Sequence, residues 1–146
     1  MLMHEEIAEH VWEAVGRWVE GRREESVQIL ATLSETQTPS MMYGVALGIA
    51  TVAKAALTKM HGSHGHACFW GIRTADGSRP EDTVPPHHLF AARFIAAYLN
   101  DDTDTTLALY DAAYRSDDPD LWPACMHTLL AATGEAVIAA TPGADR

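Results

Sequence analysis

The stretch Thr38–Met60, TPSMMYGVALGIATVAKAALTKM, decides the fold class of this chain. Thr38 can cap the first turn of a helix, and Pro39 suits the first helical position because its nitrogen needs no hydrogen bond there. The apolar residues that follow recur every three or four positions, as one face of an α-helix requires: Met42, Val45, Ile49, Val52, Ala53, Ala56 and Met60. We expect one long helix, whose small residues would let a second helix approach closely.

Further segments on both sides carry the same helical periodicity. Before the long helix, residues 7–19 and 27–33 place apolar side chains on one face, and Gly21 between them is suited to ending a helix. After it, the pattern returns in three segments, at 90–98, 107–113 and 121–136. We therefore predict an all-α chain of about six helices.

The second half of the sequence resembles the first at an offset of about 80 residues. A proline follows a capping residue at matching places, in Thr38-Pro39 and in Asp118-Pro119. Apolar residues also coincide without a gap, among them Val15 with Ile95, Trp18 with Tyr98, Leu30 with Tyr110 and Ile49 with Leu129. We predict an internal repeat of two similar three-helix units. The alternative is two unrelated helical hairpins with similar turn residues.

These patterns predict a single domain, residues 1–146, in four parts. They are a first three-helix unit (1–60), a connecting loop (61–88), a second three-helix unit (89–140) and a tail (141–146). The loop is rich in His, Gly and Pro and has no helical period. Asp76-Gly77 is a turn signal that favours a short hairpin within it.

The composition indicates which kinds of partner and which cellular compartment to expect. Twenty acidic residues oppose ten basic ones, for a formal charge of −10, so a phosphate-rich partner such as nucleic acid or an anionic membrane is not expected. No apolar run reaches the roughly 20 residues of a membrane helix, and the acidic start of the chain does not read as a signal peptide. We expect a cytoplasmic protein whose two cysteines are reduced.

The loop is the clearest candidate for a metal site. Three histidines and a cysteine lie in HGSHGHAC, residues 61–68, and two more histidines follow after Pro85-Pro86. Zinc is bound by such side chains, often in pairs two to four residues apart. The candidate ligands are His61, His64, His66, Cys68, His87 and His88. The alternative is a polar linker that binds no cofactor.

Catalytic motifs are missing from the sequence. It contains no GxSxG, HExxH or phosphate-binding GxxxxGK[ST] pattern. The Glu-x-x-His motif of a two-metal helical site is absent from the first helix, because Ile7 stands three residues before His10. Cys125 falls on an apolar stripe and is expected in the core.

The leading functional hypothesis is a non-enzymatic helical module that binds a protein partner or its own copy. Homodimers are the commonest assemblies, and a helix rich in Met and small residues packs well against a mate. The candidate interaction residues are Phe69, Trp70, Trp12 and Met42. The alternatives are a metal-binding protein, which could be an enzyme using the loop, and a small-molecule binder lined by Trp and Met between the two units.

Overall fold

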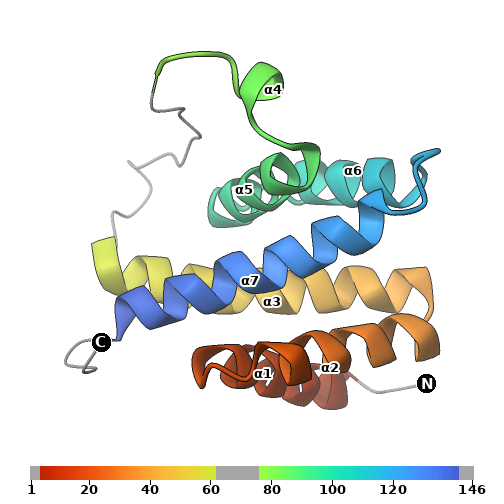
Figure 1. The fold of residues 1–146 in the computed structure, drawn as a ribbon, viewed down its shortest axis with the longest axis vertical. Helices are drawn as coiled ribbons and strands as arrows, with labels where there is room; N and C mark the ends of the chain where they lie inside the picture. The colour runs from red at the N-terminus through yellow and green to blue at the C-terminus, as the bar shows by residue number, and fades with distance from the viewer. Residues whose placement is uncertain (1–3, 62–75, 142–146) are drawn as a thin grey trace. The chain divides into compact units, whose positions relative to one another are not determined.

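The computed structural model describes residues 4–61 and 76–141, and these ranges are all-α (Figure 1). They hold seven helices and no strand, which confirms the predicted fold class. The chain forms two compact units. The first combines residues 1–63 with residues 130–146, and the second comprises residues 64–129. The last helix, α7 (Leu121–Ala140), therefore contributes its first half to the second unit and its second half to the first.

The first unit begins with the helical hairpin of α1 (His4–Val19) and α2 (Arg23–Thr36). Gly21 ends the hairpin's first helix with a φ of 82°, a value that favours glycine. Its N–H donates to the Trp18 carbonyl at 3.0 Å, and the Arg22 N–H donates to the Arg17 carbonyl at 2.8 Å. This pair of bonds is a Schellman motif, which satisfies carbonyls at the end of α1 and reverses the chain.

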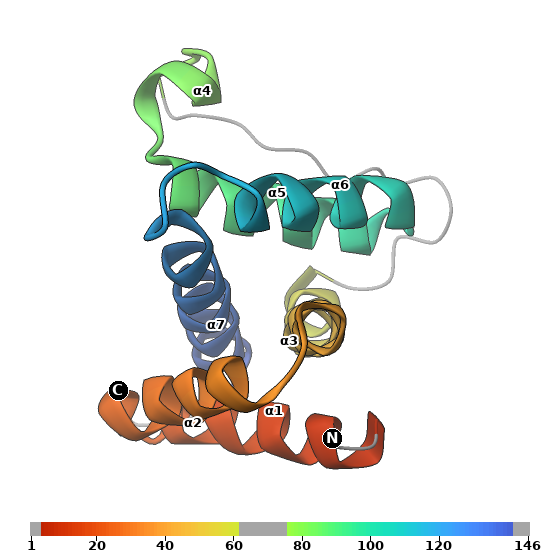
Figure 2. The same cartoon turned by 90° about the vertical axis from the view of Figure 1, so that its right-hand side faces the viewer.

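The predicted long helix is α3, Pro39–His61, which crosses the α1–α2 hairpin (Figure 2). Thr38 caps it as expected, since its hydroxyl accepts from the Met41 N–H at 3.2 Å. By length and composition this helix could cross a membrane, so the expectation that no segment reaches that length was wrong. Core helices pass the same test, and eight residues of α3 are buried in this structure.

The end of α1 meets the second half of α7 inside the first unit. The Trp18 indole N–H donates to the Glu135 carboxylate at 3.1 Å, and Arg23 donates to the same oxygen at 2.9 Å. The Arg23 guanidinium also lies over the indole ring, 5.0 Å from its centre. Gly134 leaves the space that the Trp18 side chain occupies. The buried indole therefore joins two helices far apart in sequence.

The second unit contains α4 (Pro80–Thr83), α5 (Pro86–Leu99), α6 (Thr103–Tyr114) and the first half of α7. Helix α5 begins within the residues predicted as loop, because Pro86 suits a first turn. A turn does form at Asp76, whose carboxylate accepts from the Ser78 N–H at 2.9 Å. Helix α4 follows this turn where a hairpin would need a strand, so the hairpin prediction was wrong.

The turn between α5 and α6 uses the same hydrogen bonds as the turn between α1 and α2. Asp101 has a φ of 56°, and its N–H donates to the Tyr98 carbonyl at 3.1 Å. The Asp102 N–H donates to the Ala97 carbonyl at 2.9 Å. The Asp102 carboxylate then caps α6 by accepting from the Thr105 N–H at 3.1 Å. At the other end of α6, Tyr110, Tyr114 and Trp122 form an aromatic cluster.

Candidate functional site

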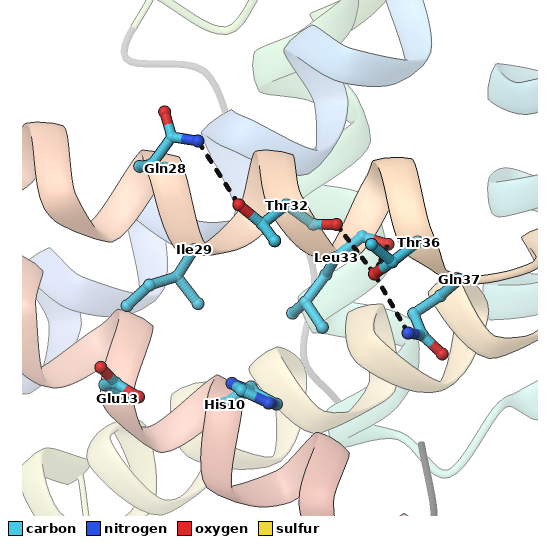
Figure 3. Close-up of a pocket in the computed structure, with 8 residues that line it drawn as sticks. All are labelled: His10, Glu13, Gln28, Ile29, Thr32, Leu33, Thr36 and Gln37. Carbon is cyan, nitrogen blue, oxygen red and sulfur yellow. Dashed lines mark hydrogen bonds between the residues drawn. The ribbon is translucent and has the colours of Figure 1, made fainter. Parts of the chain in front are cut away.

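A groove of about 470 Å³ runs between α1 and α2 (Figure 3). Two apolar side chains of α2 form its floor, the buried Leu33 and the half-buried Ile29. Helix α1 contributes His10 and Glu13 from the facing side. The rest of the lining is polar and comes from α2 and the residue that follows it: Gln28, Thr32, Thr36 and Gln37. This volume lies in the range of pockets that bind organic ligands or side chains.

The pattern of α2 explains why one edge of the groove is polar. Gln28, Thr32 and Thr36 are four residues apart and so form an exposed row beside the apolar row of Ile29 and Leu33. Figure 3 shows the polar row along one edge, joined by hydrogen bonds. Gln28 donates to the Thr32 hydroxyl at 3.4 Å, and Gln37 donates to the Thr36 hydroxyl at 3.1 Å. The groove therefore combines an apolar floor with hydroxyl and amide groups.

The hairpin around this groove is strongly acidic. Residues 4–36 contain eight Glu against three Arg and no Lys or Asp, for a formal charge of −5. Glu13, in the groove wall, is paired with Arg17 at 3.4 Å, but both side chains are partly exposed. Such an exposed pair is weak, so it leaves the carboxylate available to another cation. The groove thus favours a ligand with apolar and positively charged parts.

A smaller groove of about 220 Å³ lies between α5 and α6 in the second unit. Its lining is almost entirely apolar and includes Leu89, Phe90, Leu109 and Cys125. Arg93 is the charged member, and its guanidinium is paired with the Glu81 carboxylate of α4. Burial raises the pKa of the Cys125 thiol to about 11, so this side chain is a neutral thiol at neutral pH.

Burial shifts the pKa values of two side chains in the second unit, Cys125 and Tyr110, away from the neutral range. Burial also raises the pKa of the Tyr110 hydroxyl to about 12. A thiol or a phenol acts as a nucleophile or general base when its pKa is lowered toward neutrality, and burial raises the pKa values of Cys125 and Tyr110 instead. These two groups therefore act as uncharged parts of the core.

The predicted metal ligands fall into two sets. His64, His66 and Cys68 lie outside the described residues. His61 is exposed at the end of α3, and His87 and His88 lie in the first turn of α5 with ring centres 4.5 Å apart. Within residues 4–61 and 76–141, no group of three or more His, Cys, Asp or Glu side chains is arranged to hold a metal. Zinc binding by the loop therefore stays a prediction.

The predicted interaction residues also differ in position. Trp12 is 61% exposed on α1, whereas Met42 is 1% exposed and belongs to the core. Replacement of Met42 by a charged residue would therefore test folding and not association, because a buried side chain cannot meet a partner. Phe69 and Trp70 lie outside the described residues.

The sequence analysis did not predict the α1–α2 groove, although the polar residues at 28, 32 and 36 could have indicated a solvated edge of a helix.

Comparison with known proteins gives no relative for this chain, since no protein-family model, curated protein or solved structure matches it.

Proposed function

We propose that this chain is a non-enzymatic protein-interaction module that binds a basic amphipathic helix of a partner protein in the α1–α2 groove. The single observation that carries the proposal is the groove itself, with Ile29 and Leu33 as its floor and an acidic hairpin around it. Helices dock in such grooves through apolar side chains spaced three or four residues apart. Their opposite faces remain polar and solvated.

Charge supports a basic partner over a neutral or acidic one. The −5 charge of the hairpin would attract Lys and Arg side chains and speed their encounter with the groove. Glu13 lies in the wall, where it can pair with a cation beside the docked helix. The hydroxyl and amide edge can form hydrogen bonds to the partner's polar side chains, which helps to set its register.

The test uses a synthetic 18-residue peptide of Leu and Lys with Leu on one helical face, titrated calorimetrically into the protein. Ile29→Glu places a charge on the groove floor and should weaken binding by about tenfold or more, equivalent to ~1.4 kcal/mol. Thr32→Trp should weaken it by filling the groove without changing charge. Leu107→Glu adds the same charge at an exposed apolar position of α6 and should leave binding unchanged.

A peptide of the same composition without an apolar face controls for charge attraction alone. Equal affinity of the Ile29→Glu and Leu107→Glu proteins for the amphipathic peptide would contradict the proposal, as would equal binding of the two peptides by the parent. Melting curves of each variant exclude unfolding as the cause of lost binding.

Self-association is a second candidate, favoured by the exposure of Trp12 on α1. Tryptophans that become buried when two proteins associate often contribute much of the binding energy. Trp12 is exposed in the single chain and could take that role in a dimer. Sedimentation equilibrium should show a dimer for the parent protein and a shift toward monomer for Trp12→Ser. The matched change Leu107→Ser should leave the distribution unchanged. A monomeric parent at high concentration would remove this candidate.

We also infer that α1–α2–α3 and α5–α6–α7 descend from one duplicated three-helix unit. The two turns support this, because the bonds of Gly21 and Arg22 recur at Asp101 and Asp102, 80 positions later. Burial supports it as well, since residues 80 apart are often buried together. Such pairs are Val11 and Ala91, Ala14 and Phe94, Ser26 and Thr106, Leu30 and Tyr110, Leu33 and Ala113, Ala46 and Met126, Ile49 and Leu129, and Ala53 and Thr133.

The two grooves follow the same correspondence. Five lining residues of the α1–α2 groove have their equivalents, 80 positions later, in the lining of the α5–α6 groove. These pairs are His10 and Phe90, Glu13 and Arg93, Ile29 and Leu109, Thr32 and Ala112, and Leu33 and Ala113. The second groove is thus the apolar counterpart of the first, with the charge of its wall residue reversed.

A further inference from the structure

The α5–α6 groove has one charged side chain in an otherwise apolar lining. Arg93 of α5 is the charged lining residue, while Phe90 of the same helix and Leu109 of α6 contribute apolar surface. A cation beside apolar surface is the arrangement that recognises an anion attached to an apolar group, because the two parts of the ligand then meet complementary surfaces.

We propose that this groove binds a small aliphatic or aromatic carboxylate, with the apolar group between α5 and α6 and the carboxylate on Arg93. The volume of about 220 Å³ fits this class of ligand. An apolar cavity of about 150 Å³ in another protein holds one benzene molecule, so a single ring or a short alkyl chain is the appropriate size. The neutral Cys125 thiol keeps the groove's inner surface uncharged.

The chain already presents a carboxylate to Arg93. Glu81 in α4 forms an ion pair and a hydrogen bond with the Arg93 guanidinium. In this contact the guanidinium donates to a carboxylate, so Glu81 would compete with the proposed ligand for Arg93. Both side chains are more than one-third exposed, so separating them requires little energy.

Binding is tested with hexanoate and with the uncharged hexanamide, followed by two-dimensional amide NMR of the intact protein. Hexanoate should bind more tightly than hexanamide. Arg93→Gln should weaken hexanoate binding by about tenfold, the scale of a lost charge-assisted hydrogen bond, and should leave hexanamide binding unchanged. Glu81→Gln should instead strengthen hexanoate binding, because the competing carboxylate is gone.

Arg115→Gln is the matched control, since Arg115 also pairs with a carboxylate, Asp111, but lies outside the groove lining. It should change neither affinity. The proposal is overturned if Arg93→Gln and Arg115→Gln behave alike, if hexanoate and hexanamide bind equally, or if neither probe produces a saturable shift. Arg93→Lys, which keeps the charge, should retain part of the preference for hexanoate. This site is independent of the α1–α2 groove, so either proposal can fail alone.

Discussion

At the residue scale, the packing of Trp18 depends on the absence of a side chain at Gly134. A Cβ atom at Gly134 would lie 2.3 Å from Trp18 Cδ1 and 2.6 Å from Cγ, well inside contact distance. The indole is also held by its bond to Glu135, so it cannot move without losing that bond. The first unit therefore needs glycine at this position for steric reasons.

Gly134→Ala should lower the free energy of unfolding by about 1–3 kcal/mol through overpacking. Gly16→Ala is the matched control, because nothing lies within 4 Å of a Cβ atom at that position of α1. It should instead stabilise the protein by roughly 0.5–1 kcal/mol, since alanine favours a helix more than glycine does. Urea denaturation of both variants checks the opposite signs, and a stabilising Gly134→Ala would contradict the packing described here.

Individual residues could be predicted from sequence only where periodicity decides their face. The spacing of the apolar residues in 7–19 predicted a buried stripe of Ile7, Val11, Val15, Trp18 and Val19. The first four are buried, and Val19 is half-buried. Met42 lies on the stripe of its own helix and is buried too, so its predicted role at an interface disagreed with its periodicity. The pairing of Trp18 with Glu135 joins residues 117 positions apart, and no local pattern could indicate it.

At the element scale, the cap of α6 makes its stability depend on pH. The Asp102 carboxylate accepts from the Thr105 hydroxyl at 2.6 Å and from the Thr105 N–H, and these bonds hold the pKa of Asp102 below its ordinary value. A carboxylate with a lowered pKa stabilises the folded state above its unfolded pKa. This contribution is lost as the pH falls through the lowered value.

Asp102→Ala should therefore destabilise the protein at neutral pH, and the difference from the parent should become smaller in acid. The difference should be constant above about pH 5, where both folded and unfolded carboxylates are ionised. Asp102→Asn keeps a capping oxygen and should remove only the pH-dependent part. Thermal melts between neutral pH and about pH 2 measure this. A pH-independent gap between Asp102→Ala and the parent would contradict the cap.

A cap and a proline that stand together gave one helix start and missed another, because α7 begins at Leu121 and not at Pro119. Thr38-Pro39 gave the start of α3, and the hydrogen bond to the Thr38 hydroxyl explains why. The start of α5 was misplaced because Pro85-Pro86 was interpreted as loop, although a proline at a first helical turn loses no hydrogen bond. Helix α4 has only four residues, too few for any periodicity to appear.

At the scale of the whole molecule, the fold class was predictable because most segments repeat the same 3.6-residue pattern. The grooves were not predictable, since their shape depends on how two helices pack. The α1–α2 groove needs Ile29 and Leu33 of one helix to lie beside His10 of another. Sequence alone drew attention to the histidine loop, whose central residues lie outside the part that the structure describes.

The zinc hypothesis predicts about one equivalent of metal in tag-free protein and a lower melting temperature after chelation. The double substitution His64→Ala and Cys68→Ala should abolish both effects. His127→Ala changes an exposed histidine of α7 outside the loop and should retain the metal. Elemental analysis with and without a chelator distinguishes these outcomes, and metal-free protein with no stability change would make the loop a polar linker.

The most direct measurement of the central claim is a two-dimensional amide NMR titration of the protein with the amphipathic Leu and Lys peptide. The account predicts saturable shifts concentrated on the α1 and α2 residues around Ile29, Leu33 and His10, and their loss in Ile29→Glu. Shifts spread evenly over the acidic surface, or concentrated on helices other than α1 and α2, would contradict the α1–α2 groove as the binding site.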